Sequence, residues 1–329
     1  MHVPDGLMDP LVAALGWVEF AVVAAVALWL SRSRIAEKDL PRIAVLSAGI
    51  FVAQMLNFPI GGGTTGHLIG AALFAIMAGP VTAIIGMTVI LLIQALIFGD
   101  GGLTAFGLNA LNMAVIAPLT GWGVYTLLRP FAGGDETETS PFTGFGPVIA
   151  GIAAWTSVFV AASACAVELS LSYAVSSGTY GIASTIAIPA MLGYHALIGV
   201  GEAAITVGVA AYLWKVSPGA FARPVTEKPA AGLARVMYSR TVQAAIAVLV
   251  VFALALPLYF VYSSEGEDGL ERTMSDAGAD DGEPLLSAPL DYGEDYIAAL
   301  LAGMFGFVAT SLAALGVLSV LRSRASRAG

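Results

Sequence analysis

Long apolar runs recur along the whole chain, separated by short polar or glycine-rich stretches. A hydrocarbon core about 30 Å thick needs roughly 20 apolar residues in one helix. Each run therefore predicts a membrane-spanning helix. The predicted spans are residues 11–30, 43–58, 67–77, 81–98, 104–128, 147–171, 185–214, 242–262 and 296–321. This pattern predicts an all-α integral membrane protein.

One junction between predicted spans contains residues that do not favour a helix. Asn57 and Pro59 precede the glycine-rich stretch 61–66, and His67 opens the next apolar run. Irregular backbone at membrane depth is tolerated only where it is buried in protein or lines a cavity. We therefore expect this break to form part of a binding site.

The composition supports the membrane class and excludes several functions. Hydrophobic residues make up 58% of the chain and charged residues 11%, as expected for a polytopic membrane protein. Cys165 is the single cysteine, which argues against a disulfide framework or a thiolate zinc cluster. The sequence contains neither a Gly-x-x-x-x-Gly-Lys-Ser/Thr phosphate loop nor the His-Glu-x-x-His motif of zinc proteases. We expect a protein that is not an enzyme, with the lipid bilayer and no nucleic acid as a partner.

The net charge of −9 is unevenly distributed, and its distribution predicts the topology. If the spans alternate in direction from an external N-terminus, every Lys and Arg except Arg272 lies on one side. The positive-inside rule makes that side cytoplasmic. We expect a multi-pass protein of the cell membrane with an external N-terminus and a cytoplasmic C-terminus. The expected divisions are a membrane domain (1–214), a cytoplasmic linker (215–240) and a C-terminal part (241–329) with two spans and an acidic external loop (263–295).

The first residues carry a set of nitrogen ligands. Asp5 and Asp9 are the only charged side chains before residue 11, a pattern unlike a secretory signal, so we expect this end to be retained. The amine of Met1, the following amide nitrogen and Nδ1 of His2 would close a five- and a six-membered chelate ring on one ion. Such nitrogen ligands favour nickel, copper, cobalt or zinc over magnesium or calcium. Pro4 and Gly6 form a turn signal that lets this end fold back.

Three motifs in this order resemble one known family. They are Met1-His2-Val-Pro-Asp5-Gly6, then Asn57-Phe58-Pro59 with the following glycines, Thr65-Gly66 and His67, and finally His195-Ala-Leu-Ile-Gly199-Val-Gly201-Glu202-Ala. The resemblance is to CbiM or NikM, the substrate-binding membrane components of energy-coupling factor (ECF) transporters for cobalt and nickel. It implies a seven-span bundle with an external N-terminus.

The resemblance also implies a metal site, partners and a mechanism. In that family the ion is held by the amine of Met1, the amide nitrogen and imidazole of His2, and the imidazole aligned with His67. Two ATPase subunits and a coupling transmembrane subunit supply the energy. The chain would then import Co(II) or Ni(II), a function tied to cobalt transport, nickel transport and cobalamin biosynthesis, with no permanently bound cofactor.

The two C-terminal spans look like a fused CbiN/NikN subunit. That subunit has a Pro-Asp-Gly-Leu-Glu signature, of which this chain keeps Asp268-Gly269-Leu270-Glu271 but has Glu267 in place of the proline. The Asp-Gly pair still favours a turn. The resemblance implies that the external linker contacts the mouth of the metal site.

Further polar residues are candidates for supporting roles. Groups that bind the second nitrogen of a ligating imidazole orient the ring, and the candidates for this role are Asp5, Asn57, Thr64, Thr65 and Gln94. His195 and Glu202 lie seven residues apart on nearly the same helical face. They would form a structural pair, a relay or a coupling surface, and we favour the structural pair.

An ATP-independent, ion-coupled secondary carrier for divalent transition metals remains the alternative. Such carriers show inverted repeats and paired broken helices near the bilayer midplane. This sequence has one strong break, which favours the ECF interpretation. Transport in cells that lack the ATPase partners separates the two.

Overall fold

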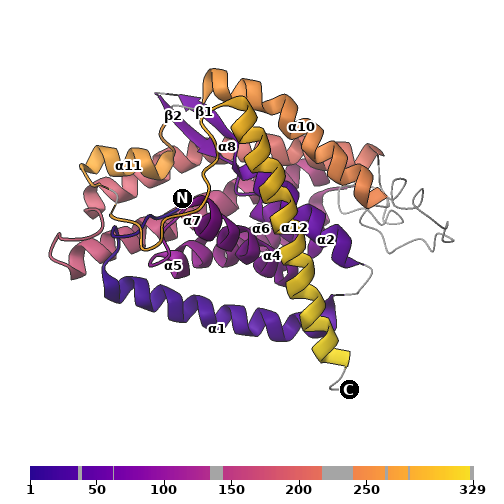
Figure 1. Ribbon diagram of the computed structural model, residues 1–329, viewed down its shortest axis with the longest axis horizontal. Helices are drawn as coiled ribbons and strands as arrows, with labels where there is room; N and C mark the ends of the chain where they lie inside the picture. The colour runs from indigo at the N-terminus through magenta and orange to yellow at the C-terminus, as the bar shows by residue number, and fades with distance from the viewer. Residues whose placement is uncertain are drawn as a thin grey trace.

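The computed structural model describes residues 1–35, 39–61, 63–133, 144–216, 240–263, 266–280 and 282–326. Helices dominate (Figure 1), and the only sheet among the described residues has two strands. The elements are α1 (Pro10–Arg34), α2 (Leu40–Gln54), β1 (Asn57–Gly61), β2 (Thr64–His67), α3 (Ala71–Ala78), α4 (Pro80–Ile93), η2 (Gln94–Phe98), α5 (Phe106–Ala110), η3 (Leu111–Ile116), α6 (Ala117–Leu128), η4 (Arg129–Phe131), α7 (Gly146–Val175), α8 (Ser184–Val216), α10 (Arg240–Tyr262), α11 (Gly269–Ala277) and α12 (Tyr296–Ser326).

Seven helical segments of the described chain are long and apolar enough to cross a membrane, which confirms the all-α membrane class. Two of the nine expected spans are shorter. The run expected at 43–58 forms the 15-residue α2, and the run expected at 67–77 forms the 8-residue α3. Both are shortened because strands occupy the residues between them. The expected linker 215–240 lies outside the described residues except at its ends.

The helices expose apolar side chains on their outer surface. On α1 the residues Leu11, Leu15, Val18, Val22 and Val26 recur every three or four positions and are all at least half exposed. This spacing places them on one face of the helix. An outward apolar face of this kind fits contact with lipid, while the interior holds the polar side chains.

The glycine-rich break is an antiparallel β-hairpin. Asn57 pairs with His67 and Phe58 with Gly66, and the register becomes irregular after Pro59. Gly61 (φ 104°) and Gly63 (φ 79°) adopt left-handed conformations at the turn, which glycine reaches at little cost. The helix expected to resume at His67 therefore begins only at Ala71. His67 is the last residue of β2, and that strand is buried throughout.

The C-terminal part packs across the N-terminal bundle. In Figure 1, α12 crosses in front of α4 and reaches α2, and the linker between α11 and α12 passes beside the N-terminus. Phe51 of α2 and Phe252 of α10 are both buried against glycines of α12, Gly306 and Gly303. The two C-terminal spans are therefore integrated into the same helical body.

Candidate metal centre

The N-terminal segment is buried in the bundle. The side chain of Asn109 in α5 binds the peptide of Val3 in both directions, accepting from its N–H at 2.8 Å and donating to its carbonyl at 3.0 Å. The amide of Gly102 donates to the same carbonyl at 2.8 Å. Met1 is 2% exposed. These bonds hold the start of the chain in place through the peptide of Val3.

Three predicted ligands meet at this end of the chain. The nitrogen of the Met1 ammonium lies 3.4 Å from Nε2 of His67. The rings of His2 and His67 are stacked, with centroids 5.1 Å apart. Nδ1 of His67 lies 3.1 Å from the carbonyl oxygen of Leu68, which only accepts hydrogen bonds. The proton of the neutral ring therefore sits on Nδ1, and the lone pair of Nε2 faces the Met1 nitrogen.

Electrostatics keep the His67 imidazole neutral. Burial, followed by the Met1 ammonium and His2, lowers its pKa to about 4 despite the nearby carboxylates. The ring thus presents a lone pair at neutral pH, which is the state that a metal ion requires.

His2 differs from the expected chelate. Its Nδ1 lies 3.1 Å from Oδ1 of Asp100, and its Nε2 lies 3.2 Å from Oε1 of Gln94. Burial lowers the pKa of His2, while the Asp100 carboxylate opposes this shift. A neutral imidazole donates through only one nitrogen. If the metal is held as the sequence predicts, Nδ1 of His2 must leave the Asp100 carboxylate and bind the ion instead.

Gln94 is the candidate supporting residue that contacts a predicted ligand directly. Its amide also donates to Gln54 at 2.8 Å, and the amide of Gln54 donates to the carbonyl of Ile69 at 2.7 Å. This chain of hydrogen bonds links His2 to the segment that follows His67.

The other four supporting candidates bind elsewhere. Thr65 accepts from Asn57 at 3.3 Å and donates to the carbonyl of Gly266 at 2.8 Å, and Thr64 pairs with Glu267. Asp5 accepts from the amide and hydroxyl of Thr104 at 2.7 and 2.6 Å and from the amide of Leu285 at 2.9 Å. These residues hold the surrounding loops and the C-terminal linker. Their hydrogen bonds do not reach an imidazole, in contrast to the expected role of orienting one.

His195 and Glu202 do not form the expected pair. Seven residues advance a helix by about 10 Å along its axis, which is too far for a hydrogen bond. Nδ1 of His195 donates to the carbonyl of Met191 at 2.9 Å. The Glu202 carboxylate accepts from the amides of Ile69 at 2.7 Å and Gly70 at 2.9 Å. Glu202 therefore holds the turn immediately after His67.

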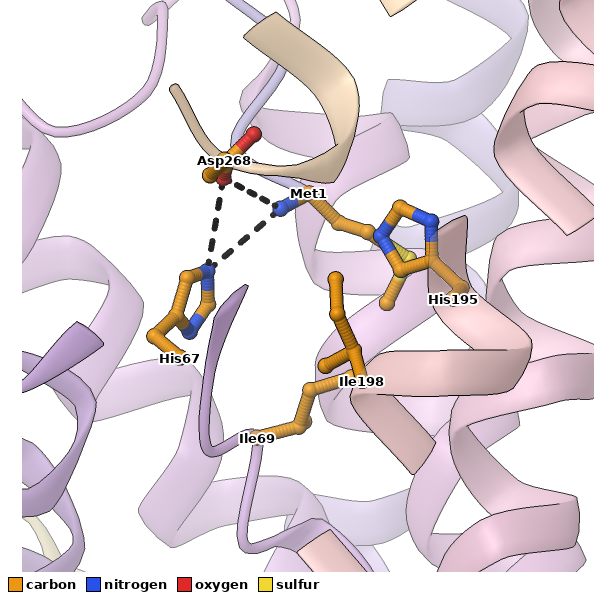
Figure 2. Close-up of a pocket in the computed structure, with 6 residues that line it drawn as sticks. All are labelled: Met1, His67, Ile69, His195, Ile198 and Asp268. Carbon is orange, nitrogen blue, oxygen red and sulfur yellow. Dashed lines mark hydrogen bonds and ion pairs between the residues drawn. The ribbon is translucent and has the colours of Figure 1, made fainter. Parts of the chain in front are cut away.

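The structure adds a site residue that the sequence did not suggest. Oδ2 of Asp268 lies 3.3 Å from the Met1 nitrogen and 3.7 Å from Nε2 of His67, as the dashed lines in Figure 2 show. Burial raises the pKa of the Asp268 carboxyl, but the ammonium and the imidazole together outweigh it and hold this pKa well below the usual range. In the sequence, Asp268 belongs to an Asp-x-x-Glu pattern with Glu271. This pattern is typical of a helix N-cap, so it does not distinguish a site residue from a capping residue.

A metal ion here would depend on the main chain. Among the described residues, no three His, Cys, Asp or Glu side chains are placed to hold an ion together. The amine of Met1 completes the nitrogen set beside His67. Imidazole and amine nitrogens suit divalent transition metals.

Comparisons with known proteins point to metal transport. Residues 2–220 match CbiM, described as the cobalt uptake substrate-specific transmembrane region. A proposed fused nickel transport protein NikMN of Archaeoglobus fulgidus is 32% identical over 318 residues, covering 94% of this chain and 95% of the relative. The fused nickel transport protein NikMN of Rhodobacter capsulatus is 38% identical over 231 residues, covering 66% of this chain and 63% of the relative. A crystal structure of a transition metal transporter is 38% identical with a TM-score of 0.57, covering 66% of this chain and 93% of that one.

Proposed function

Since this chain belongs to the CbiM family of cobalt uptake substrate-specific transmembrane regions, we propose that it binds Co(II) or Ni(II) at its N-terminus and passes the ion into the cytoplasm. It is a multi-pass membrane component of cobalt or nickel transport. The ligands would be the Met1 amine, the amide nitrogen and imidazole of His2, and the imidazole of His67. The observation that carries the proposal is the buried Met1 nitrogen 3.4 Å from Nε2 of His67.

The donor chemistry supports a late transition metal as the cargo. When the ion binds, the Met1 ammonium gives up a proton and the amide nitrogen of His2 gives up another, because both must present lone pairs. His2 turns Nδ1 from Asp100 toward the ion and closes the chelate. Magnesium and calcium prefer oxygen ligands and are poorly matched to four nitrogens.

Energy would come from separate subunits. The sequence contains no phosphate-binding loop, so the proposed complex includes two ATPase subunits and a coupling transmembrane subunit. The N-terminus would face the outside and the C-terminus the cytoplasm, because nearly all Lys and Arg residues then lie inside. Residues 1–214 would form the metal-binding membrane domain and 241–329 a CbiN/NikN-like part. Uptake that persists in cells without ATPase partners would favour an ion-coupled secondary carrier instead.

The first experiment measures Ni(II) and Co(II) binding to the purified full-length chain. The variants are His67→Ala and a chain with one residue added before Met1. Both should abolish binding of a near-stoichiometric ion, because one removes a ligand and the other displaces the amine. The preferred ion identifies the cargo.

An exposed carboxylate outside the site provides a control. Asp280→Asn removes a possible metal ligand that lies outside the proposed set, and it should leave affinity for the ion close to that of the wild type. Binding that survives His67→Ala or the added residue would contradict the proposed site.

A further inference from the structure

Three atoms from distant parts of the chain converge beside the N-terminus. They are the Met1 nitrogen, Nε2 of His67 and Oδ2 of Asp268, separated by 3.4 Å, 3.3 Å and 3.7 Å. The point equidistant from all three lies about 2.0 Å from each, which matches the distances of roughly 2.0–2.2 Å at which nitrogen and carboxylate ligands hold a divalent ion. Two nitrogens and one oxygen are therefore spaced as ligands of a single ion.

The Asp268 carboxylate is held in place by its own helix. Oδ1 accepts from the amides of Leu270 at 2.7 Å and Glu271 at 2.9 Å, and the Glu271 side chain accepts from the amide of Asp268 at 2.7 Å. This capping box occupies Oδ1. Oδ2 is left to face Met1 and His67.

The surroundings fix the position of α11 relative to the N-terminus. The carbonyl of Glu267 accepts from the amide of Thr65 at 2.8 Å, next to His67 in β2. Gly269 packs so closely against His195 of α8 that an added Cβ would lie 2.8 Å from Cε1 of that ring. A cavity of about 10 Å³, roughly the space of one water, is lined by Met1, His67, Ile69, His195, Ile198 and Asp268 (Figure 2).

We propose that Asp268 is a ligand for the arriving metal ion, which first binds the Met1 amine, the His67 imidazole and this carboxylate. His2 does not take part in this first set, because its Nδ1 faces Asp100. The ion then exchanges the carboxylate for the amide and imidazole nitrogens of His2. Asp268 thus gives the C-terminal part a direct role in loading the metal ion. This inference rests on the proposed function, because it requires the N-terminal metal site.

The test compares association rates of Co(II) and Ni(II) with the full-length protein, followed by the visible absorbance of the bound ion. Asp268→Asn removes the charge but keeps a good helix N-cap. It should slow association about tenfold or more, which is the size of effect that even the hydrogen-bond partners of metal ligands have on affinity or activity. Asp280→Asn, which removes an exposed carboxylate from the same linker, should bind at the wild-type rate.

Two outcomes would overturn the inference. If Asp268→Asn binds as fast as Asp280→Asn or faster, the carboxylate only pairs with the amine and does not receive the ion. If Asp268→Ala slows association while Asp268→Asn does not, the residue acts as a helix cap.

His67→Ala in the same series separates this inference from the proposed function. If His67→Ala binds like the wild type, the N-terminal site itself fails. If His67→Ala loses the ion while Asp268→Asn leaves the rate unchanged, only the role of Asp268 fails.

Discussion

At the scale of single residues, buried polar side chains position the N-terminal nitrogens. Glu202 is fully buried and accepts from two consecutive backbone amides directly after His67. These amides precede α3, where a negative charge is also favoured by the helix dipole. Asn109 holds Val3 by accepting from its amide and donating to its carbonyl. Both residues act on the site through the backbone.

We predict that Glu202→Gln lowers metal affinity by about tenfold or more, because misplacing a ligand through its support has effects of this size. A glutamine offers one acceptor oxygen and turns an NH₂ group toward the second backbone donor. The unsatisfied amide should also cost about 1–3 kcal/mol of stability. Metal titration and thermal unfolding in detergent measure the two effects.

The control for this prediction is Glu283→Gln, which neutralises an exposed glutamate of the C-terminal linker. It should alter neither the affinity nor the unfolding temperature. Wild-type affinity in Glu202→Gln would show that the turn after His67 keeps its position without the carboxylate.

At the scale of elements, close helix packing positions the loop that meets the N-terminus. α5, which carries Asn109, packs against α1 (Figure 1), and one glycine of each helix lies at the contact. A Cβ on Gly107 would collide with the backbone of Trp17, and a Cβ on Gly16 would collide with the side chain of Leu108. Small residues at such crossings let two membrane helices approach closely.

We predict that Gly107→Ala destabilises the protein by about 1–3 kcal/mol, the usual cost of overpacking a tight contact. The methyl group meets backbone atoms, which cannot rotate away. Separation of α5 from α1 should also displace Asn109 and weaken metal binding. Thermal unfolding and metal titration of the purified variant measure both effects.

Gly123→Ala in α6 makes the same chemical change where no atom lies within 4 Å of the added methyl. This variant should unfold at or slightly above the wild-type temperature. Equal stability of the two alanine variants would mean that the α1–α5 contact adjusts freely.

At the scale of the whole molecule, the linker between α11 and α12 covers the N-terminal segment. The amide of Gly282 donates to the carbonyl of Asp5 at 3.0 Å, and the amide of Leu290 donates to the carbonyl of Ile97 at 3.0 Å. Tyr292 donates to Asp100 at 2.8 Å. Burial, together with the Asp100 carboxylate, keeps the pKa of this phenol well above its usual value, so it remains a donor. The linker therefore lies over the residues next to His2.

We predict that a disulfide between Ile97→Cys and Leu290→Cys slows metal exchange strongly, because it ties the linker over the site. The backbone hydrogen bond brings the two residues close together, as the short Cα separation of a disulfide requires. The natural Cys165 is buried and free, so it should not compete. Exchange of bound Ni(II) is measured under oxidising and reducing conditions.

Reduction should restore the exchange rate, and each single cysteine variant should behave like the wild type. Equal exchange in the oxidised and reduced forms would mean that the ion reaches the site by another route.

The sequence by itself determined the membrane class, and it places the nitrogens of Met1 and His2 next to each other. Long apolar runs can be satisfied only by spanning helices, and the chelate of Met1 and His2 involves adjacent residues. These features are local in the chain.

Only the tertiary structure showed that Asp268 lies beside Met1 and His67. Met1 and Asp268 are 267 positions apart, and no periodicity relates them. The sequence predicts a break at 57–67 but not the hairpin that forms there, because glycines and β-branched threonines suit both a break and a strand. The sequence pattern places His195 and Glu202 on one helical face. In the fold, His195 instead binds the carbonyl of Met191, and Glu202 binds backbone amides of the segment after His67. Most buried polar groups pair with a nearby donor or acceptor, and the packed fold determines which of these lies within reach.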